Sequence, residues 1–114
     1  MRHFLEVDDL SVDELRRVME LSVETNLPKV LDGQGVALVF EKPSGRTRNS
    51  MEMATVQLGG HPVYIKPEEL GIDTRETAED VARTMAGYHS VLAARVFDHD
   101  RLERMAATLS LIHI

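Results

Sequence analysis

The chain has 114 residues, a length that suits one domain, and 43% of them are hydrophobic but only 4% aromatic, so the core is expected to be mostly aliphatic. The net charge of -6 argues against nucleic acids and anionic membranes as general partners, because both carry negative charge themselves. The absence of cysteine excludes a disulfide framework, thiol catalysis and a cysteine zinc site, and it is compatible with a reducing cytoplasmic compartment.

The start of the chain is charged and contains no long apolar run, so neither a secretory signal nor a membrane span is expected there. Ser11 and Glu14 then have the spacing of a capping box, which predicts that a helix begins at this point. This helix should end near Glu24, before Pro28. Its inward face is expected to consist of apolar residues at helical spacing: Leu15, Val18 and Met19.

The segment 36–40 is apolar throughout and lies between two turn-forming stretches, 31–35 and 41–45. Such a run predicts a strand that is buried on both faces, as in a parallel sheet covered by helices. A second helix should follow from about Arg46 or Thr47 and stop at the glycine pair 59–60. Its expected inner face is Met51, Ala54 and Leu58.

The remaining chain predicts two more strands and two more helices. A short strand is expected at 63–65, after Pro62, and a third strand at 91–96. Thr77 is placed to cap the helix between them, and Asp98 or Asp100 should begin the last helix. The expected inner faces of these helices are Val81, Ala82 and Met85 for the first, and Leu102, Met105 and Ala106 for the second.

The alternation of helices and strands predicts an α/β fold in three layers, with a mainly parallel sheet between helices. Sheets of this kind bind ligands beyond the carboxyl ends of their strands. Two places in the sequence satisfy that rule: the loop after Phe40, and the end of the third strand at Arg95.

The loop after Phe40 has the chemistry of an anion site. Arg46 and Arg48 carry fixed positive charges, Ser44 and Thr47 add hydroxyl donors, and Gly45 allows close approach of the backbone. The loop also opens a helix, whose first amides attract anions. The spacing is not that of a Walker loop. The alternative is a basic helix start that only balances an acidic surface.

Arg95 ends an otherwise apolar strand, where a charge is costly unless it is paired or faces a cleft. It could extend into solvent or pair with Asp98 or Asp100. A ligand role becomes the favoured interpretation beside the loop 44–48, since both could reach one anion.

No metal site is predicted, because the histidines lack the spacing of metal ligands to one another or to acidic residues: positions 3, 61, 89, 99 and 113. Met51 and Met53 are interpreted as core or gap-filling residues rather than as a groove for a partner.

The stretch Phe40–Arg48, FEKPSGRTR, resembles the Phe-Glu-Lys-x-Ser-Thr-Arg-Thr-Arg signature of the ornithine carbamoyltransferases. The resemblance covers about residues 3–107. It continues through four more segments and the opening of the chain: MEMA at 51–54, QLGGHP at 57–62, ETAEDVAR at 76–83, ARVF at 94–97, and HFL with DDL at 3–10.

The resemblance implies a carbamoyltransferase amino-terminal domain without a cofactor. It implies that Ser44, Gly45, Arg46 and Thr47 hold the phosphate of carbamoyl phosphate, and that Arg95 contacts the same ligand near its carbonyl. Arg46 and Arg95 would then be the catalytic residues, because they stabilise charge on the leaving phosphate and polarise the carbonyl. Arg48 is expected to support the loop.

The reaction implied is carbamoyl transfer to the side-chain amine of ornithine, giving citrulline and phosphate in arginine biosynthesis. The pair Glu41-Lys42 favours the ornithine branch over the aspartate branch. Gly45 departs from the threonine of many members, so one hydroxyl contact is lost. The family's acceptor-binding second domain and its His-Pro-x-Gln motif are not in this chain, and the full-length family enzymes usually form homotrimers.

Three interpretations stay open: a carbamoyltransferase fragment that is inactive alone, a stand-alone anion-binding module, and a transferase with another acceptor such as aspartate. The domain is expected to span 1–108. The last residues, 109–114, do not resemble the family's continuation and match the translated end of a sequencing-library adapter, so they are interpreted as a non-native tail. The alternative is that they form a final apolar strand.

Overall fold

The computed structural model describes residues 2–42 and 44–112, so Pro43 of the predicted turn and His113 lie outside the described residues. The elements follow one another as 3-10 helix η1 (Val7–Asp9), α1 (Val12–Leu21), β1 (Gly35–Phe40), α2 (Gly45–Gln57), β2 (His61–Ile65), α3 (Pro67–Leu70), α4 (Ala78–Tyr88), β3 (Val91–Arg95) and α5 (His99–Ile112). The α/β prediction is confirmed, and η1 and α3 are additions to it.

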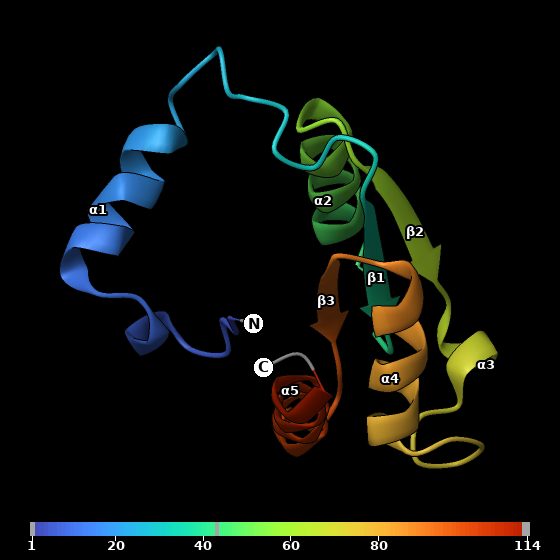
Figure 1. The fold of residues 1–114 in the computed structure, drawn as a ribbon. Helices are drawn as coiled ribbons and strands as arrows, with labels where there is room; N and C mark the ends of the chain where they lie inside the picture. The colour runs from blue at the N-terminus through green and yellow to red at the C-terminus, as the bar shows by residue number, and fades with distance from the viewer. Residues whose placement is uncertain (1, 43, 113–114) are drawn as a thin grey trace.

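The sheet has three parallel strands in the order β2-β1-β3 (Figure 1). The central position of β1 explains why its sequence is apolar throughout, since both faces and both edges of the strand are covered. All side chains from Val36 to Phe40 are buried. The predicted strand, buried on both faces, is therefore confirmed.

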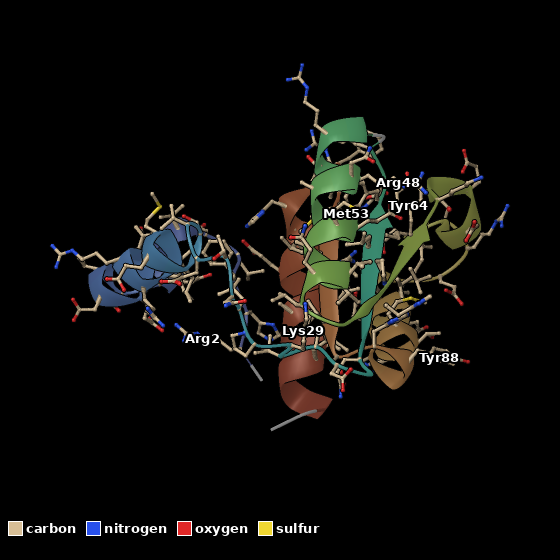
Figure 2. The ribbon with its side chains drawn as sticks, turned by 90° about the horizontal axis from the view of Figure 1, so that it is seen from above. Arg2, Lys29, Arg48, Met53, Tyr64 and Tyr88 are labelled. Atoms are coloured by element: carbon tan, nitrogen blue, oxygen red, sulfur yellow. The ribbon has the colours of Figure 1, made fainter. Side chains whose placement is uncertain are left out.

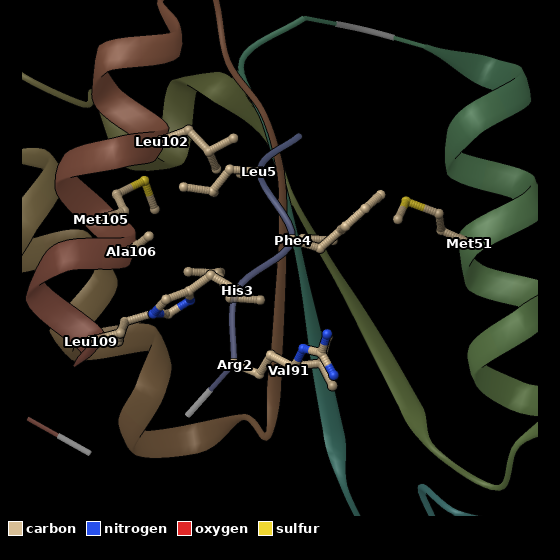
Figure 3. Close-up of a pocket in the computed structure, with 13 residues that line it drawn as sticks. Arg2, His3, Phe4, Leu5, Met51, Val91, Leu102, Met105, Ala106 and Leu109 are labelled. Carbon is tan, nitrogen blue, oxygen red and sulfur yellow. The ribbon is translucent and has the colours of Figure 1, made fainter. Parts of the chain in front are cut away.

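Alternate residues of β1 face two different layers. Ala37 and Val39 belong to the larger core, which α4 and α5 complete. Val36, Leu38 and Phe40 form a smaller cluster on the opposite face. That face is covered by α2, which lies on the other side of the sheet from α5 (Figure 3). None of the helices in the described part is long and apolar enough to cross a bilayer.

The predicted inner face of α2 is partly wrong. Of its predicted residues, Met51 and Ala54 are exposed and Leu58 is half-buried, whereas Thr55 is buried at 5% exposure. Met53, also interpreted as a core or gap-filling residue, is 55% exposed. The burial of this polar side chain is tolerated because the Thr55 hydroxyl donates to the Met51 carbonyl at 2.8 Å. Met51 and Met53 are therefore not core residues in this structure.

The first helix forms as predicted but does not pack as predicted. Its capping box is present, with Ser11 and Glu14 exchanging hydrogen bonds at 2.9 and 3.1 Å. The helix ends at Leu21 rather than near Glu24. It stands apart from the sheet (Figure 1), and its apolar residues are exposed instead of buried: Leu15, Val18 and Met19.

The ends of other elements also differ from the prediction. Strand β2 begins at His61 and includes Pro62, which an edge strand tolerates because half of its backbone N–H groups have no ladder partner. Helix α5 runs through Ile112, so the alternative of a final apolar strand is wrong. Leu109 packs in the larger core. Residues 113 and 114 of the predicted tail lie outside the described residues, and the origin of 109–114 stays a prediction.

Acidification is expected to weaken α1. Glu14 accepts hydrogen bonds from the Arg2 side chain and the Ser11 amide, and these lower its pKa from 4.5 to about 2. Because the folded-state pKa is depressed, the stabilisation is present above pH 4.5 and is lost as the pH falls from there towards 2. Amide hydrogen exchange of α1 across this window measures the effect. In Glu14→Gln the protection of α1 should no longer depend on this titration. A variant with the same pH dependence as the parent would contradict the assignment.

Candidate anion site

The amino terminus of α2 differs from those of the other helices in its capping and in the charge of its first turn. Ser44 is its N-cap residue, but the Ser44 side chain makes no capping hydrogen bond, whereas the caps Ser11 and Thr77 both accept one. Within residues 2–42 and 44–112, every other helix has an acidic residue in its first turn, and α2 has none. The positive end of α2 is thus left without an intramolecular anion.

The two arginines of the loop have different surroundings. The guanidinium of Arg48 lies 3.8 Å from the centre of the Tyr64 ring, and its Nε is 3.5 Å from a Glu52 carboxylate oxygen (Figure 2). Arg46 is exposed and has no ion pair with a carboxylate in the described part of the chain. Arg48 is therefore held by the protein, while Arg46 keeps its donors available.

Arg95 lies at the same edge of the sheet as this loop. It is the last residue of β3, it is exposed, and it stands in register with Phe40, the last residue of β1. The alternative pairing with Asp98 or Asp100 is absent from the described structure: Asp98 caps the start of α5, and Asp100 faces Arg104. The topology thus brings the loop 44–48 and Arg95 to one edge, as predicted.

The sequence analysis used Glu41 only as a family marker and did not predict its contacts at this edge. The Glu41 side chain is only 11% exposed and pairs with Arg101 of α5. The neighbouring Lys42 lies over the Phe97 ring, 5.3 Å from its centre. A signal was present, because an acidic residue directly after a buried strand and before a basic loop needs a partner.

The histidines do not form a second site. In the part of the chain that the structure describes, no group of three or more histidine or acidic side chains could hold a metal ion. His89 lies at the other end of the sheet, beside Gly35. Burial, and then the charge of His61, lower the pKa of His89.

A separate cavity of about 400 Å³ lies between the first residues of the chain, β3 and α5 (Figure 3). Its walls are mostly apolar and include Phe4, Leu5, Met51, Leu102 and Met105. None of the predicted anion-binding residues lines it. The cavity is therefore distinct from the edge that carries Ser44 and Arg95.

Comparison with known proteins agrees with this arrangement. Residues 2–114 match the family model described as the aspartate/ornithine carbamoyltransferase, carbamoyl-P binding domain. The chain is 37% identical to an ornithine carbamoyltransferase of Methanocaldococcus jannaschii over 91% of its own length and 36% of that protein. It is 41% identical to one of Hyperthermus butylicus, over 96% of the chain and 37% of the relative.

Solved structures agree as well. The crystal structure of ornithine carbamoyltransferase from Thermus thermophilus matches with a TM-score of 0.81 and 38% identity, over 92% of this chain and 38% of that one. The anabolic enzyme of Campylobacter jejuni matches with a TM-score of 0.85 and 31% identity, over 95% and 36%. The chain thus spans little more than a third of the length of these relatives. It belongs to the aspartate/ornithine carbamoyltransferase family and corresponds to the carbamoyl-phosphate-binding domain of that family.

Proposed function

We propose that this chain binds carbamoyl phosphate as the donor for carbamoyl transfer to the side-chain amine of ornithine, which yields citrulline and phosphate. The observation that carries the proposal is the open amino terminus of α2, whose Ser44 hydroxyl is unbonded, at the sheet edge that also carries Arg95. A helix terminus with free donors and an unpaired arginine suits a phosphate group.

In the proposed complex the phosphate lies against Ser44, Arg46, Thr47 and the amide of Gly45. Apart from Gly45, its chain neighbours and the backbone of α2, no heavy atom of the described residues lies within 4 Å of the point where a Gly45 side chain would begin, so the ligand can approach the backbone there. Arg48, stacked on Tyr64, fixes the first turn of α2 rather than touching the ligand. This division of roles follows from the surroundings of the two side chains, since Arg48 lies over Tyr64 and beside Glu52, whereas Arg46 has no such contact in the described part of the chain.

The chemistry needs charge stabilisation at two places. The uncharged amine attacks the carbamoyl carbon, the bond from that carbon to the phosphate oxygen breaks, and phosphate leaves with the electron pair. The proton lost by the amine nitrogen passes to the departing phosphate. Arg95 polarises the carbonyl as negative charge grows on its oxygen, and Arg46 stabilises the departing phosphate. Holding donor and acceptor side by side removes much of the entropic barrier.

Ornithine is the proposed acceptor because the relatives reported above are named ornithine carbamoyltransferases and because of the Glu41-Lys42 pair. Aspartate is the alternative acceptor. We place the acceptor site in a second domain, and the full-length protein in a homotrimer, as the family resemblance implies. The 114-residue chain is therefore expected to bind the donor and to form no citrulline alone.

Calorimetric titration of the chain with carbamoyl phosphate tests the proposal. We expect saturable binding at one site per chain that weakens as salt is added, because the contacts are largely ionic. Ornithine and aspartate, each added with carbamoyl phosphate, should give no carbamoylated product. A chain that is folded by circular dichroism but takes up no carbamoyl phosphate would refute the proposal.

A further inference from the structure

Glu41 joins the two halves of the proposed anion site. Its backbone N–H donates to the Arg95 carbonyl at 2.8 Å. One of its carboxylate oxygens accepts from the Phe97 N–H at 3.3 Å, and the other pairs with Arg101 at 2.5 Å. Two of these contacts tie the loop that leads to Ser44 to the segment that carries Arg95, and the third anchors Glu41 to α5.

The partner of Glu41 is itself held in place. The Nε of Arg101 lies 3.2 Å from the Asp73 carboxylate, which also pairs with Arg104. The backbone of Asp73 is left-handed, with φ of 59°, and its other carboxylate oxygen accepts from the Ala78 N–H at 3.1 Å. Arg101 is thus fixed between two carboxylates, which makes the contact with Glu41 a defined one.

The ion pair between Glu41 and Arg101 also matters for the charge of the proposed site. A negative carboxylate beside an anion site would repel the ligand and could pair with its arginines. Arg101 neutralises Glu41 from the side of α5 and leaves Arg46 and Arg95 without that competitor. Glu41 itself reaches Arg95 only through the Arg95 backbone carbonyl, so it holds that residue without binding its guanidinium.

The ligand has two ends that the site must grip together. In the proposed function, from which this step follows, the phosphate end lies on residues 44–47 and the carbamoyl carbonyl lies near Arg95. Inorganic phosphate offers only the first end. We propose that Glu41 is a positioning residue that sets the span between the phosphate-binding loop and Arg95, and so makes the site selective for carbamoyl phosphate over inorganic phosphate.

The test compares the dissociation constants of both ligands in the 114-residue chain and in Glu41→Gln. The glutamine keeps the shape and can still accept from Phe97, but it loses the charge that holds Arg101. The affinity for carbamoyl phosphate should fall about tenfold, while that for inorganic phosphate changes less than about twofold. Only a ligand that contacts both the loop 44–47 and Arg95 depends on the distance between them. A role limited to stability would change the melting temperature and leave the ratio of the two constants unaltered.

Two further variants sharpen the result. Glu41→Asp keeps the charge but shortens the reach to Phe97 and Arg101, and its ratio should shift in the same direction if Glu41→Gln fails to fold. Glu20→Gln is the matched control, because it makes the same chemical change in an exposed ion pair, with Arg17, on α1, which stands apart from the sheet. Its ratio should equal that of the parent chain.

The outcomes separate the two proposals. Folded Glu41 variants that keep the parent ratio overturn the positioning role, and so does a parent chain that binds both ligands equally well. A parent chain that binds no carbamoyl phosphate at all refutes the proposed function instead.

Discussion

Phe40→Ala is expected to lower the free energy of unfolding by about 3–5 kcal/mol, the usual loss when a buried phenylalanine is truncated. Phe40 is 1% exposed and ends the central strand. Its ring meets the Tyr64 ring edge-on, with centroids 5.5 Å apart, and Tyr64 in turn carries Arg48. Truncation would therefore leave a cavity beside Tyr64. It would also loosen Arg48, which lies over the Tyr64 ring in the first turn of α2.

Urea denaturation followed by circular dichroism measures this loss. Phe4→Ala makes the same chemical change at a side chain that is 61% exposed, and it should cost less than about 1 kcal/mol. Since domains of this size are stable by about 5–15 kcal/mol in total, Phe40→Ala should leave a visibly less stable protein. Equal losses in the two variants would contradict the packing assigned to Phe40.

Arg46→Ala should weaken carbamoyl-phosphate binding by about two orders of magnitude, because it removes the charge-assisted hydrogen bonds that the proposal assigns to the phosphate. Stability should hardly change, since Arg46 is exposed and has no ion pair with a carboxylate in the described part of the chain. The loss of affinity and the unchanged unfolding curve together distinguish ligand contact from a structural role.

Calorimetry on the parent and on Arg46→Ala provides the measurement. Arg16→Ala is the matched control: Arg16 is an exposed arginine on α1, far from the sheet edge, and its loss changes the net charge equally. If the affinity of Arg46→Ala equals that of the parent, the loop does not bind the donor. A similar drop in both variants would mean that net charge alone governs binding.

Local patterns predicted most of the elements. The capping residues Ser11 and Thr77 begin helices as expected, because a cap depends on backbone groups within three residues. The strand at 36–40 was recognisable because burial on both faces demands an apolar side chain at every position. Both kinds of signal are contained in a short stretch of chain.

Features that depend on distant packing were not predictable in this way. Thr55 faces inward and Met53 outward because of how α2 meets the sheet, which helical spacing alone does not set. The apolar face of α1 has the same periodicity whether or not another element covers it. Periodicity identifies a face, but it does not identify what that face contacts.

The same division applies to the anion site. The loop 44–48 and Arg95 were recognisable from residue type, position after a strand and the family signature. The partners of Glu41 were not, since Arg101 becomes its neighbour only once β1 and β3 lie side by side. Likewise, the stacking of Arg48 on Tyr64 requires β2 on the other side of β1.

The strand order β2-β1-β3 also bears on how the chain folds. Only α2 separates β1 from β2, whereas α2, β2, α3 and α4 all intervene between β1 and β3. Joining β1 to β3 therefore closes the longer loop and carries the larger loss of chain entropy. The loop 44–48 and Arg95 come to the same end of the sheet only at that closure, so binding of carbamoyl phosphate, if the proposed site is correct, is expected only in the completed fold.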